Sequence, residues 1–256
     1  MAALDNLPNL GAAGWGLIVA APFIGSFLGV LIRRLPEGRP IVWARSACES
    51  CGAALRAGEL VPLVSWAVGR GRCRSCGRPI GWFYPGVELA ALAVGLIALA
   101  VDEVEAAWLD CLLGWWLLAL AWIDARRWIL PDALTLPLIV AGLLAALVFD
   151  PETLAARALG AAAGYLVLRL VAWAYLRLRG REGLGQGDAK LFAAAGAWLG
   201  ILALPQVILV AAVTALAAAA AQRLSGMQVR AQSALPFGPF LALAIWVLWL
   251  FGPLPL

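Results

Sequence analysis

Two aspartates in apolar surroundings, Asp124 and Asp188, are the residues best suited to acid–base chemistry. Asp124 closes an apolar run, and Asp188 follows alternate glycines at Gly183, Gly185 and Gly187. The glycines permit positive φ angles and a close approach of another helix. Two carboxyl groups brought together share a proton, so one accepts a proton from water while the other polarises a carbonyl. We therefore predict that Asp124 and Asp188 form a catalytic pair.

Other interpretations of the polar residues around these aspartates stay open. An Asp at the end of an apolar run is commonly a helix cap, and we interpret Asp132, which follows Pro131, as an N-cap. The glycine-rich segment before Asp188 also suits a phosphate loop, although no β-strand precedes it. Lys190, a candidate for a Ser–Lys pair, lies two residues beyond Asp188 and so points to a nearly opposite side of a helix. We interpret Lys190 as an interfacial cation.

Four cysteines form two C-x-x-C pairs, Cys48 with Cys51 and Cys73 with Cys76. Two such pairs supply four thiolates in tetrahedral geometry, which predicts a structural zinc site, with iron as the other metal that the ligands suit. A metal with four protein ligands has no open position, so it would fold the loop rather than catalyse. The alternatives are two disulfides or a redox dithiol, but a cytoplasmic location disfavours stable disulfides.

The composition excludes several classes of protein. The chain has 256 residues and no His, which removes Ser-His-Asp and Cys-His nucleophiles and His-ligated catalytic zinc. It is 64% hydrophobic and 13% charged, with a mean hydropathy of +0.91. The net charge of +4 does not indicate nucleic-acid binding, because its arginines lie in loops that the positive-inside rule retains in the cytoplasm.

Apolar runs of about 16–20 residues recur along most of the chain, and they are long enough to cross a bilayer as helices. They predict an all-α polytopic membrane protein with about eight transmembrane helices and a small cytoplasmic four-Cys metal-binding loop domain. The predicted spans are 14–32, 86–101, 106–123, 133–149, 153–175, 189–204, 206–221 and 236–253. The predicted organisation is an N-terminal transmembrane anchor (1–32), the four-cysteine domain (33–82) and a transmembrane core that carries both aspartates (83–256).

Several motifs, taken in order, resemble one known family. They are Gly25-Ser26-Phe27-Leu28, Arg34-Leu35-Pro36, both cysteine pairs, Tyr84-Pro85, Ile123-Asp124, Leu130-Pro131-Asp132, Gly185-Gln186-Gly187-Asp188-Ala189-Lys190-Leu191 and Pro236-Phe237-Gly238-Pro239-Phe240. Along nearly its whole length the chain resembles the type IV prepilin peptidases, bifunctional leader peptidase/N-methyltransferases of the GxGD aspartyl protease group. It departs from them at Glu49, where Pro is common.

The resemblance implies a function and a location. Asp124 and Asp188 would be the catalytic pair of a multi-pass enzyme of the bacterial inner membrane, embedded in the lipid bilayer, with its active site near the cytoplasmic face. The substrates would be prepilins or type II secretion pseudopilins, with a basic leader and an apolar helix, cut after a Gly. The new N-terminal residue would be methylated with S-adenosylmethionine, for which no motif locates a binding site. Glu182 is a candidate for attracting the basic leader.

Two functions of other classes remain as alternatives. Aspartates at membrane depth and glycine-broken helices also suit an ion-coupled transporter. The paired cysteines and the lack of recognisable inverted halves favour the peptidase. A non-catalytic scaffold of a secretion machine would tolerate loss of both aspartates. The sequence leaves open the pilus or secretion client and the oligomeric state.

Overall fold

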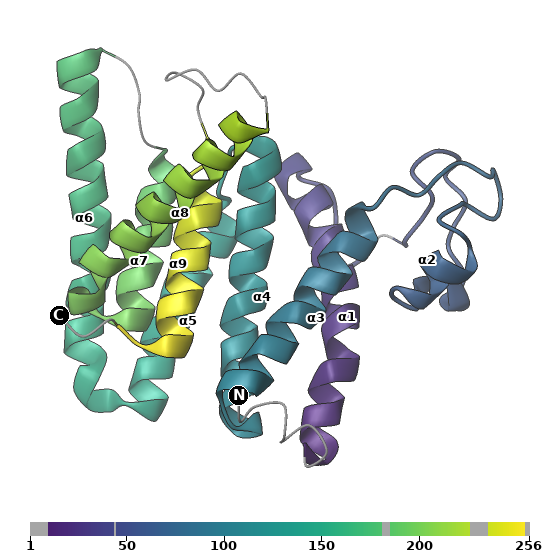
Figure 1. Cartoon of the computed structure of the whole chain (residues 1–256), viewed down its shortest axis with the longest axis horizontal. Helices are drawn as coiled ribbons and strands as arrows, with labels where there is room; N and C mark the ends of the chain where they lie inside the picture. Colours follow the sequence, from purple (N-terminus) through teal and green to yellow (C-terminus); the bar gives the residue numbers. More distant parts are fainter. Residues whose placement is uncertain (1–9, 44, 181–184, 226–234, 254–256) are drawn as a thin grey trace. The chain divides into compact units, whose positions relative to one another are not determined.

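The computed structural model describes residues 10–43, 45–180, 185–225 and 235–253. This part of the chain is helical, and its β-structure is limited to two isolated antiparallel bridges, Ala47 with Ala54 and Arg72 with Pro79. The long helices, labelled in Figure 1, are α1 (Gly11–Arg34), α3 (Phe83–Val101), α4 (Val104–Arg127), α5 (Asp132–Phe149), α6 (Leu154–Arg179), α7 (Gln186–Leu199), α8 (Leu204–Leu224) and α9 (Gly238–Phe251). The short helices are η2 (Leu35–Glu37), η3 (Ala57–Leu60), α2 (Val64–Val68), η4 (Pro151–Thr153) and η5 (Ile201–Ala203). The prediction of an all-α fold is confirmed.

The eight long helices follow the eight predicted spans in order, but only six are long and apolar enough to cross a membrane: α1, α3, α4, α5, α6 and α8. α7 and α9 have 14 residues each. A helix of that length spans about 21 Å, less than the hydrocarbon core of about 30 Å. The predicted span 189–204 ends early because Gly200, at φ +84°, stops α7. The chain is a polytopic membrane protein.

The chain divides into two compact units, Met1–Ala119 and Leu120–Leu256, and α4 contributes residues to both. In the first unit, α1 packs on α3. Small residues let the two backbones approach: a Cβ added at Gly25 would lie 2.7 Å from the Cα of Glu88. The Trp115 indole of α4 donates a hydrogen bond to the Ala91 carbonyl of α3, at 2.9 Å. The loop that carries α2 joins the end of α1 to the start of α3 (Figure 1).

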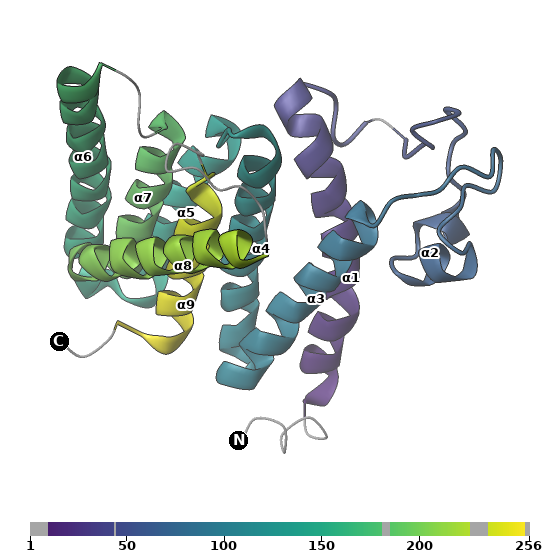
Figure 2. The same ribbon diagram turned by 45° about the horizontal axis from the view of Figure 1, so that its top comes forward.

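In the second unit, α7 is the central helix and contacts α5, α6, α8 and α9. Its side chains are buried from Leu191 to Trp198. α6 and α7 touch through backbone, since a Cβ at Gly196 would lie 2.2 Å from the carbonyl carbon of Gly160. α8 is strongly inclined to α6 in both views (Figures 1 and 2). A helix enclosed on several sides fixes the position of any group at its N-terminus.

Polar anchors hold the other end of α7. The Trp198 indole donates to the Leu138 carbonyl of α5 at 2.9 Å, and its ring lies where a side chain at Gly142 would be. The Arg157 guanidinium donates to the Trp198 carbonyl at 2.7 Å. This hydrogen bond satisfies one of the carbonyls that a helix C-terminus leaves free.

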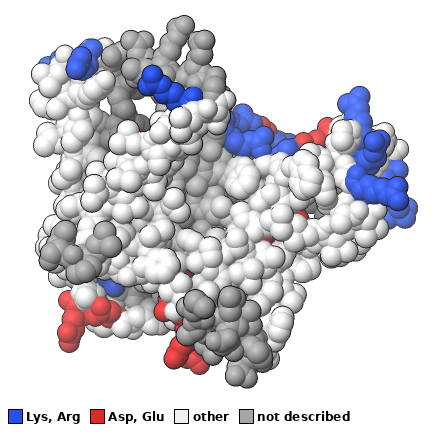
Figure 3. All heavy atoms as spheres, in the orientation of Figure 1, with Lys and Arg blue, Asp and Glu red and all other residues white. Residues whose placement is uncertain are grey.

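The charged residues at the two ends of α6 have opposite sign. Arg177 and Arg179 lie in its last turn, whereas Asp150 and Glu152 lie in the connection that precedes it. Figure 3 shows basic side chains at one end of this helix and acidic side chains at the other. The positive-inside rule predicts that the arginine end faces the cytoplasm.

Candidate active site and metal centre

Asp124 lies near the C-terminal end of α4 and is 6% exposed. One of its oxygens, Oδ2, accepts a hydrogen bond from the backbone N–H of Gly238 at 3.0 Å. Gly238 is the first residue of α9, and the first N–H groups of a helix have no partner within it. A Cβ at Gly238 would lie 2.7 Å from the same oxygen. Position 238 therefore accommodates only glycine while Asp124 keeps this pose.

Asp188 is the third residue of α7 and is 9% exposed. Its Oδ2 accepts the backbone N–H of Gly185 at 3.1 Å, so Asp188 caps the first turn of its own helix. Neither Gly185, with φ −69°, nor Gly187 has a positive φ, so for these two glycines that expectation is wrong. The glycines serve close packing instead: a Cβ at Gly187 would lie 2.7 Å from the Cβ of Leu130. Glu182 and Gly183 lie outside the described residues.

The structure brings the two predicted carboxyl groups together. Asp124 and Asp188 lie close enough for the charge on Asp124 to act on Asp188. Each carboxyl group accepts one backbone N–H, and neither is ion-paired with a Lys or Arg of the described residues. Two buried acids that interact and have no cation beside them do not easily ionise together. This is the arrangement that acid–base hydrolysis requires, and the catalytic role itself stays a prediction.

Asp132 does not have the role that the sequence suggested. Pro131 occupies the N-cap of α5 and Asp132 is the first helical residue, without a side-chain capping bond. Its carboxylate instead accepts a hydrogen bond from the Lys190 ammonium, with Oδ1 and Nζ 2.5 Å apart. The N-cap interpretation of Asp132 is therefore wrong, and Lys190 is the partner of this acid. The pair joins the first residue of α5 to the fifth residue of α7, two residues beyond Asp188, and no local pattern could have revealed it.

The two cysteine pairs lie in two hairpins with the same hydrogen bonds. The backbone N–H of Cys48 donates to the carbonyl of Ala53, and that of Cys73 donates to the carbonyl of Arg78, both at 2.9 Å. The backbone N–H of the glycine that follows each pair donates to the carbonyl of the first cysteine of that pair, at 2.8 Å. Gly52 and Gly77 have φ angles of +71° and +68°, which favour glycine. Each hairpin therefore forms the tight knuckle that a metal site needs.

The four sulfur atoms have the spacing of metal ligands. They all lie within 4.8 Å of one another, and the Sγ atoms of Cys48 and Cys76, and of Cys51 and Cys73, are 4.0 Å apart. Tetrahedral zinc with bonds of about 2.3 Å would place its sulfur ligands about 3.8 Å apart. The backbone N–H groups of Cys51 and Ser50 lower the pKa of the Cys48 thiol to about 6. The donor set therefore fits a metal with four thiolate ligands.

Comparisons with known proteins agree with this geometry. The model of the Bacterial Peptidase A24 N-terminal domain matches residues 19–101, and that of the Type IV leader peptidase family matches residues 111–220. The prepilin leader peptidase/N-methyltransferase of Burkholderia pseudomallei (strain 1026b) is 44% identical, over 88% of this chain and 81% of the relative. That of Dickeya chrysanthemi is 41% identical, over 89% of each chain.

The similarity extends over almost the full chain in some relatives. The prepilin leader peptidase/N-methyltransferase of Xanthomonas campestris pv. campestris is 37% identical over 98% of this chain and 95% of its own. No solved structure shows significant similarity. Identity of this extent, together with matches to both family models, shows that the chain belongs to the type IV leader peptidase family.

Proposed function

We propose that the chain is an aspartyl endopeptidase of the bacterial inner membrane that removes the leader of prepilins or type II secretion pseudopilins after a Gly. We further propose that it then methylates the new N-terminal amine. The observation that carries the peptidase is the buried pair Asp124 and Asp188, each oriented by a backbone N–H. The names of the relatives, which join a leader peptidase to an N-methyltransferase, support both activities.

In the proposed cleavage, one carboxylate of the pair takes a proton from water, and the water oxygen attacks the scissile carbonyl. The other, protonated, carboxyl group donates a hydrogen bond to the carbonyl oxygen. The C–N bond then breaks, and the leaving amine takes a proton from the pair. No metal is required for these steps, because the shared proton moves between two acids and the substrate.

The positions of the helices support a proposed path for the substrate. Its apolar segment would lie beside the spans, and its basic leader would stay on the side of the arginine end of α6, which we assign to the cytoplasm. Helical carbonyls are already hydrogen-bonded, so the peptide must unwind before water can attack. A Gly at the cleavage site lowers the cost of unwinding.

The cysteines have a different proposed role. Residues 33–82 would form a cytoplasmic domain folded around one zinc ion held by Cys48, Cys51, Cys73 and Cys76. Residues 1–32 would anchor the chain, and residues 83–256 would form the peptidase core. With four thiolate ligands, the zinc supplies folding energy rather than a reactive position. S-adenosylmethionine, when bound, supplies the methyl group that the freed amine accepts.

The direct test is co-expression with a prepilin and a gel assay for leader loss. Asp124→Asn and Asp188→Asn keep the shape of each side chain but remove its acid, so each should stop cleavage while the protein still inserts. Asp102→Asn, an exposed acid that follows α3, is the matched control and should cleave normally. Normal processing by either active-site variant would contradict the pair.

A further inference from the structure

The loop between α1 and α3 carries a large positive charge. Residues 33–82 contain nine arginines and three glutamates, which gives a net charge of +6, against +4 for the whole chain. Each glutamate is paired with one arginine: Glu37 with Arg39, Glu49 with Arg33 and Glu59 with Arg74. Arg70, Arg72 and Arg78 are exposed and have no ion pair among the residues that the structure describes. Figure 3 shows basic side chains at the outer end of this loop.

The same loop exposes apolar side chains close to these arginines. Val64 and Val68 are 57% and 80% exposed and lie four residues apart, on one face of α2. Trp82 is 70% exposed and packs on Trp66 of α2, with ring centroids 4.3 Å apart. Together with the exposed Val61, the side chains of Val64, Val68 and Trp82 form the apolar patch. An exposed apolar patch beside basic side chains is typical of a surface that rests on a membrane.

The apolar patch lies alongside the end of α3 and not beyond it (Figures 1 and 2). α3 has 19 residues, about 29 Å, which only just crosses a hydrocarbon core of about 30 Å. The N–H of Leu63 donates to Oε2 of Glu88, the sixth residue of α3, at 2.8 Å. Glu88 lies about 8 Å along the helix from its first residue. Leu63 therefore reaches the depth of about 5–10 Å at which interfacial segments bury their apolar side chains.

The backbone around Leu63 is satisfied within the protein, as this depth requires. Pro62 has no N–H, and the N–H groups of Val64 and Ser65 donate to backbone carbonyls at 2.5 and 3.0 Å. Leu63 has a φ of +60° and a ψ of −49°, a conformation that residues with a Cβ rarely adopt. This conformation directs its N–H at the buried carboxyl group of Glu88. Acyl chains offer no hydrogen bonds, so a segment that enters them must pair its polar groups internally.

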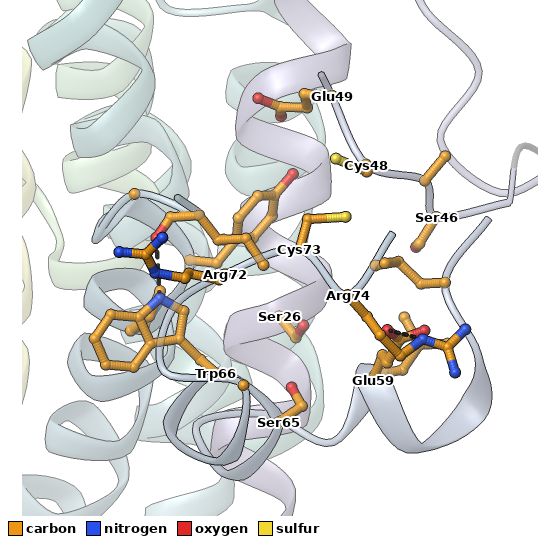
Figure 4. A pocket seen from close by; sticks show the side chains of 18 of the residues that line it. Ser26, Ser46, Cys48, Glu49, Glu59, Ser65, Trp66, Arg72, Cys73 and Arg74 are labelled. Carbon is orange, nitrogen blue, oxygen red and sulfur yellow. Dashed lines mark hydrogen bonds and ion pairs between the residues drawn. The ribbon is translucent and has the colours of Figure 1, made fainter. Parts of the chain in front are cut away.

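The lipid-facing surface of α1 continues into the apolar patch. Ser26 of α1 lines one cavity with Val64 and Ser65 of the loop, and Figure 4 shows the two serines near each other. Phe23 and Phe27, which flank Ser26 on α1, are 52% and 50% exposed. Because α1 is a membrane span, these rings contact acyl chains. The loop therefore lies next to lipid through its attachment to α1 and α3.

We propose that the four-cysteine loop rests in the headgroup layer of the inner leaflet. The apolar patch contacts acyl chains, and Arg70, Arg72 and Arg78 contact the phosphates of anionic phospholipids, which attract a loop of charge +6. The loop is then held on the membrane surface instead of moving freely in water. This inference concerns where the loop lies, and neither proposed activity depends on it.

The test is fluorine NMR of the full chain, labelled with 5-fluorotryptophan, in nanodiscs that contain phosphatidylglycerol. The signal of Trp82 is identified by its loss in Trp82→Phe. A doxyl-labelled phospholipid broadens signals that lie in lipid, and a water-soluble gadolinium chelate broadens those that lie in water. Trp82 should respond to the lipid label, as should Trp15, an exposed residue of α1, and should be shielded from the chelate. Trp198, which is 1% exposed, should respond to neither agent.

Two results for Trp82 would overturn the proposal. Broadening by the chelate and not by the lipid label would place the loop in water. Protection from both agents would show that a second copy of the chain covers the apolar patch.

The contact with phosphates is tested by Arg70→Gln combined with Arg78→Gln. In phosphatidylglycerol nanodiscs, this variant should expose Trp82 to the chelate about tenfold more than the wild type, because two attractive charges are lost. In phosphatidylcholine nanodiscs, which have no anionic headgroups, the variant and the wild type should not differ. Equal exposure of Trp82 in the variant and the wild type in both kinds of nanodisc would contradict the proposal.

Discussion

The four-cysteine loop of the first unit and the aspartate pair of the second hold their functional groups in opposite ways. The cysteines sit in two hairpins whose hydrogen bonds close within about five residues, and Cys51 and Cys76 are exposed. The aspartates are buried, and distant segments pack around them: Gly238 contacts Asp124, and Leu130 packs on Gly187, the residue before Asp188.

This difference separates a site built by local sequence from a site built by packing. A metal ion can complete the cysteine site once the two hairpins meet, so its geometry depends on thiols and a few glycines. The aspartate pair depends on how closely α4, α7 and α9 approach one another. Changes to the cysteine loop should therefore affect metal binding most, whereas small steric changes around α7 and α9 should affect leader cleavage.

Removing the metal should give the largest effect on the first region. Cys48→Ser with Cys76→Ser should reduce the proposed bound zinc from one per chain to none and unfold the loop, because structural zinc contributes about 10–16 kcal/mol in small domains. Metal content is measured by mass spectrometry, and leader cleavage should fall less than methylation. Cys111→Ser, buried in α4, is the control and should keep its metal. Retention of one metal by the double variant would exclude the four-cysteine site.

In the second region, a single methyl group added at position 238 should greatly slow leader cleavage. Gly238→Ala would place a Cβ 2.7 Å from the Asp124 carboxylate, so we expect leader cleavage to fall about 100-fold. The metal content should stay unchanged. Gly16→Ala, where nothing lies within 4 Å, is the control. Rapid cleavage by Gly238→Ala would show that the pose of Asp124 does not matter for the reaction.

The ion pair between Asp132 and Lys190 should have a smaller effect on cleavage. Asp132→Asn or Lys190→Met should each lower kcat about three- to tenfold with little change in KM, because the pair ties the N-terminal part of α7 to α5 but is partly exposed. The exchanged variant, Asp132→Lys with Lys190→Asp, should recover part of kcat. Matching changes at the exposed pair of Glu37 and Arg39, Glu37→Gln or Arg39→Met, should leave kcat and KM unchanged. If the exchanged variant recovers no kcat, and KM rises in the single variants by as much as kcat falls, the pair contacts the substrate instead.

The contact between Gly187 and Leu130 should have the smallest effect and should appear in stability. Gly187→Ala would bring a Cβ within 2.7 Å of Leu130, which should cost about 1–3 kcal/mol and lower the melting temperature by several degrees. Leu130→Gly removes the contacting Cβ, so in a double-mutant cycle Gly187→Ala should cost much less in a Leu130→Gly chain than in the wild type. An unchanged melting temperature in Gly187→Ala would mean that the segment moves aside without cost.

The same contrast explains what the sequence could predict. The helices follow from apolar runs, and the metal ligands follow from the spacing of Cys48, Cys51, Cys73 and Cys76. Gly185 and Gly187 were expected to need positive φ angles, but neither has one, and Gly187 instead allows the close approach of Leu130, which no local pattern encodes. Gly238 was visible only as part of a motif, and its contact with Asp124 depends on tertiary packing. Asp132 was assigned as a cap because its partner, Lys190, lies on another helix.

The central claim is that Asp124 and Asp188 act as one unit. The most direct measurement is the rate of leader cleavage by purified Asp124→Asn, Asp188→Asn and the double variant, at saturating substrate. If the two acids share one proton, each single variant should lose about as much activity as the double variant, because removing either partner removes the unit. Losses that multiply in the double variant, or a single variant that retains most of its rate, would contradict the account.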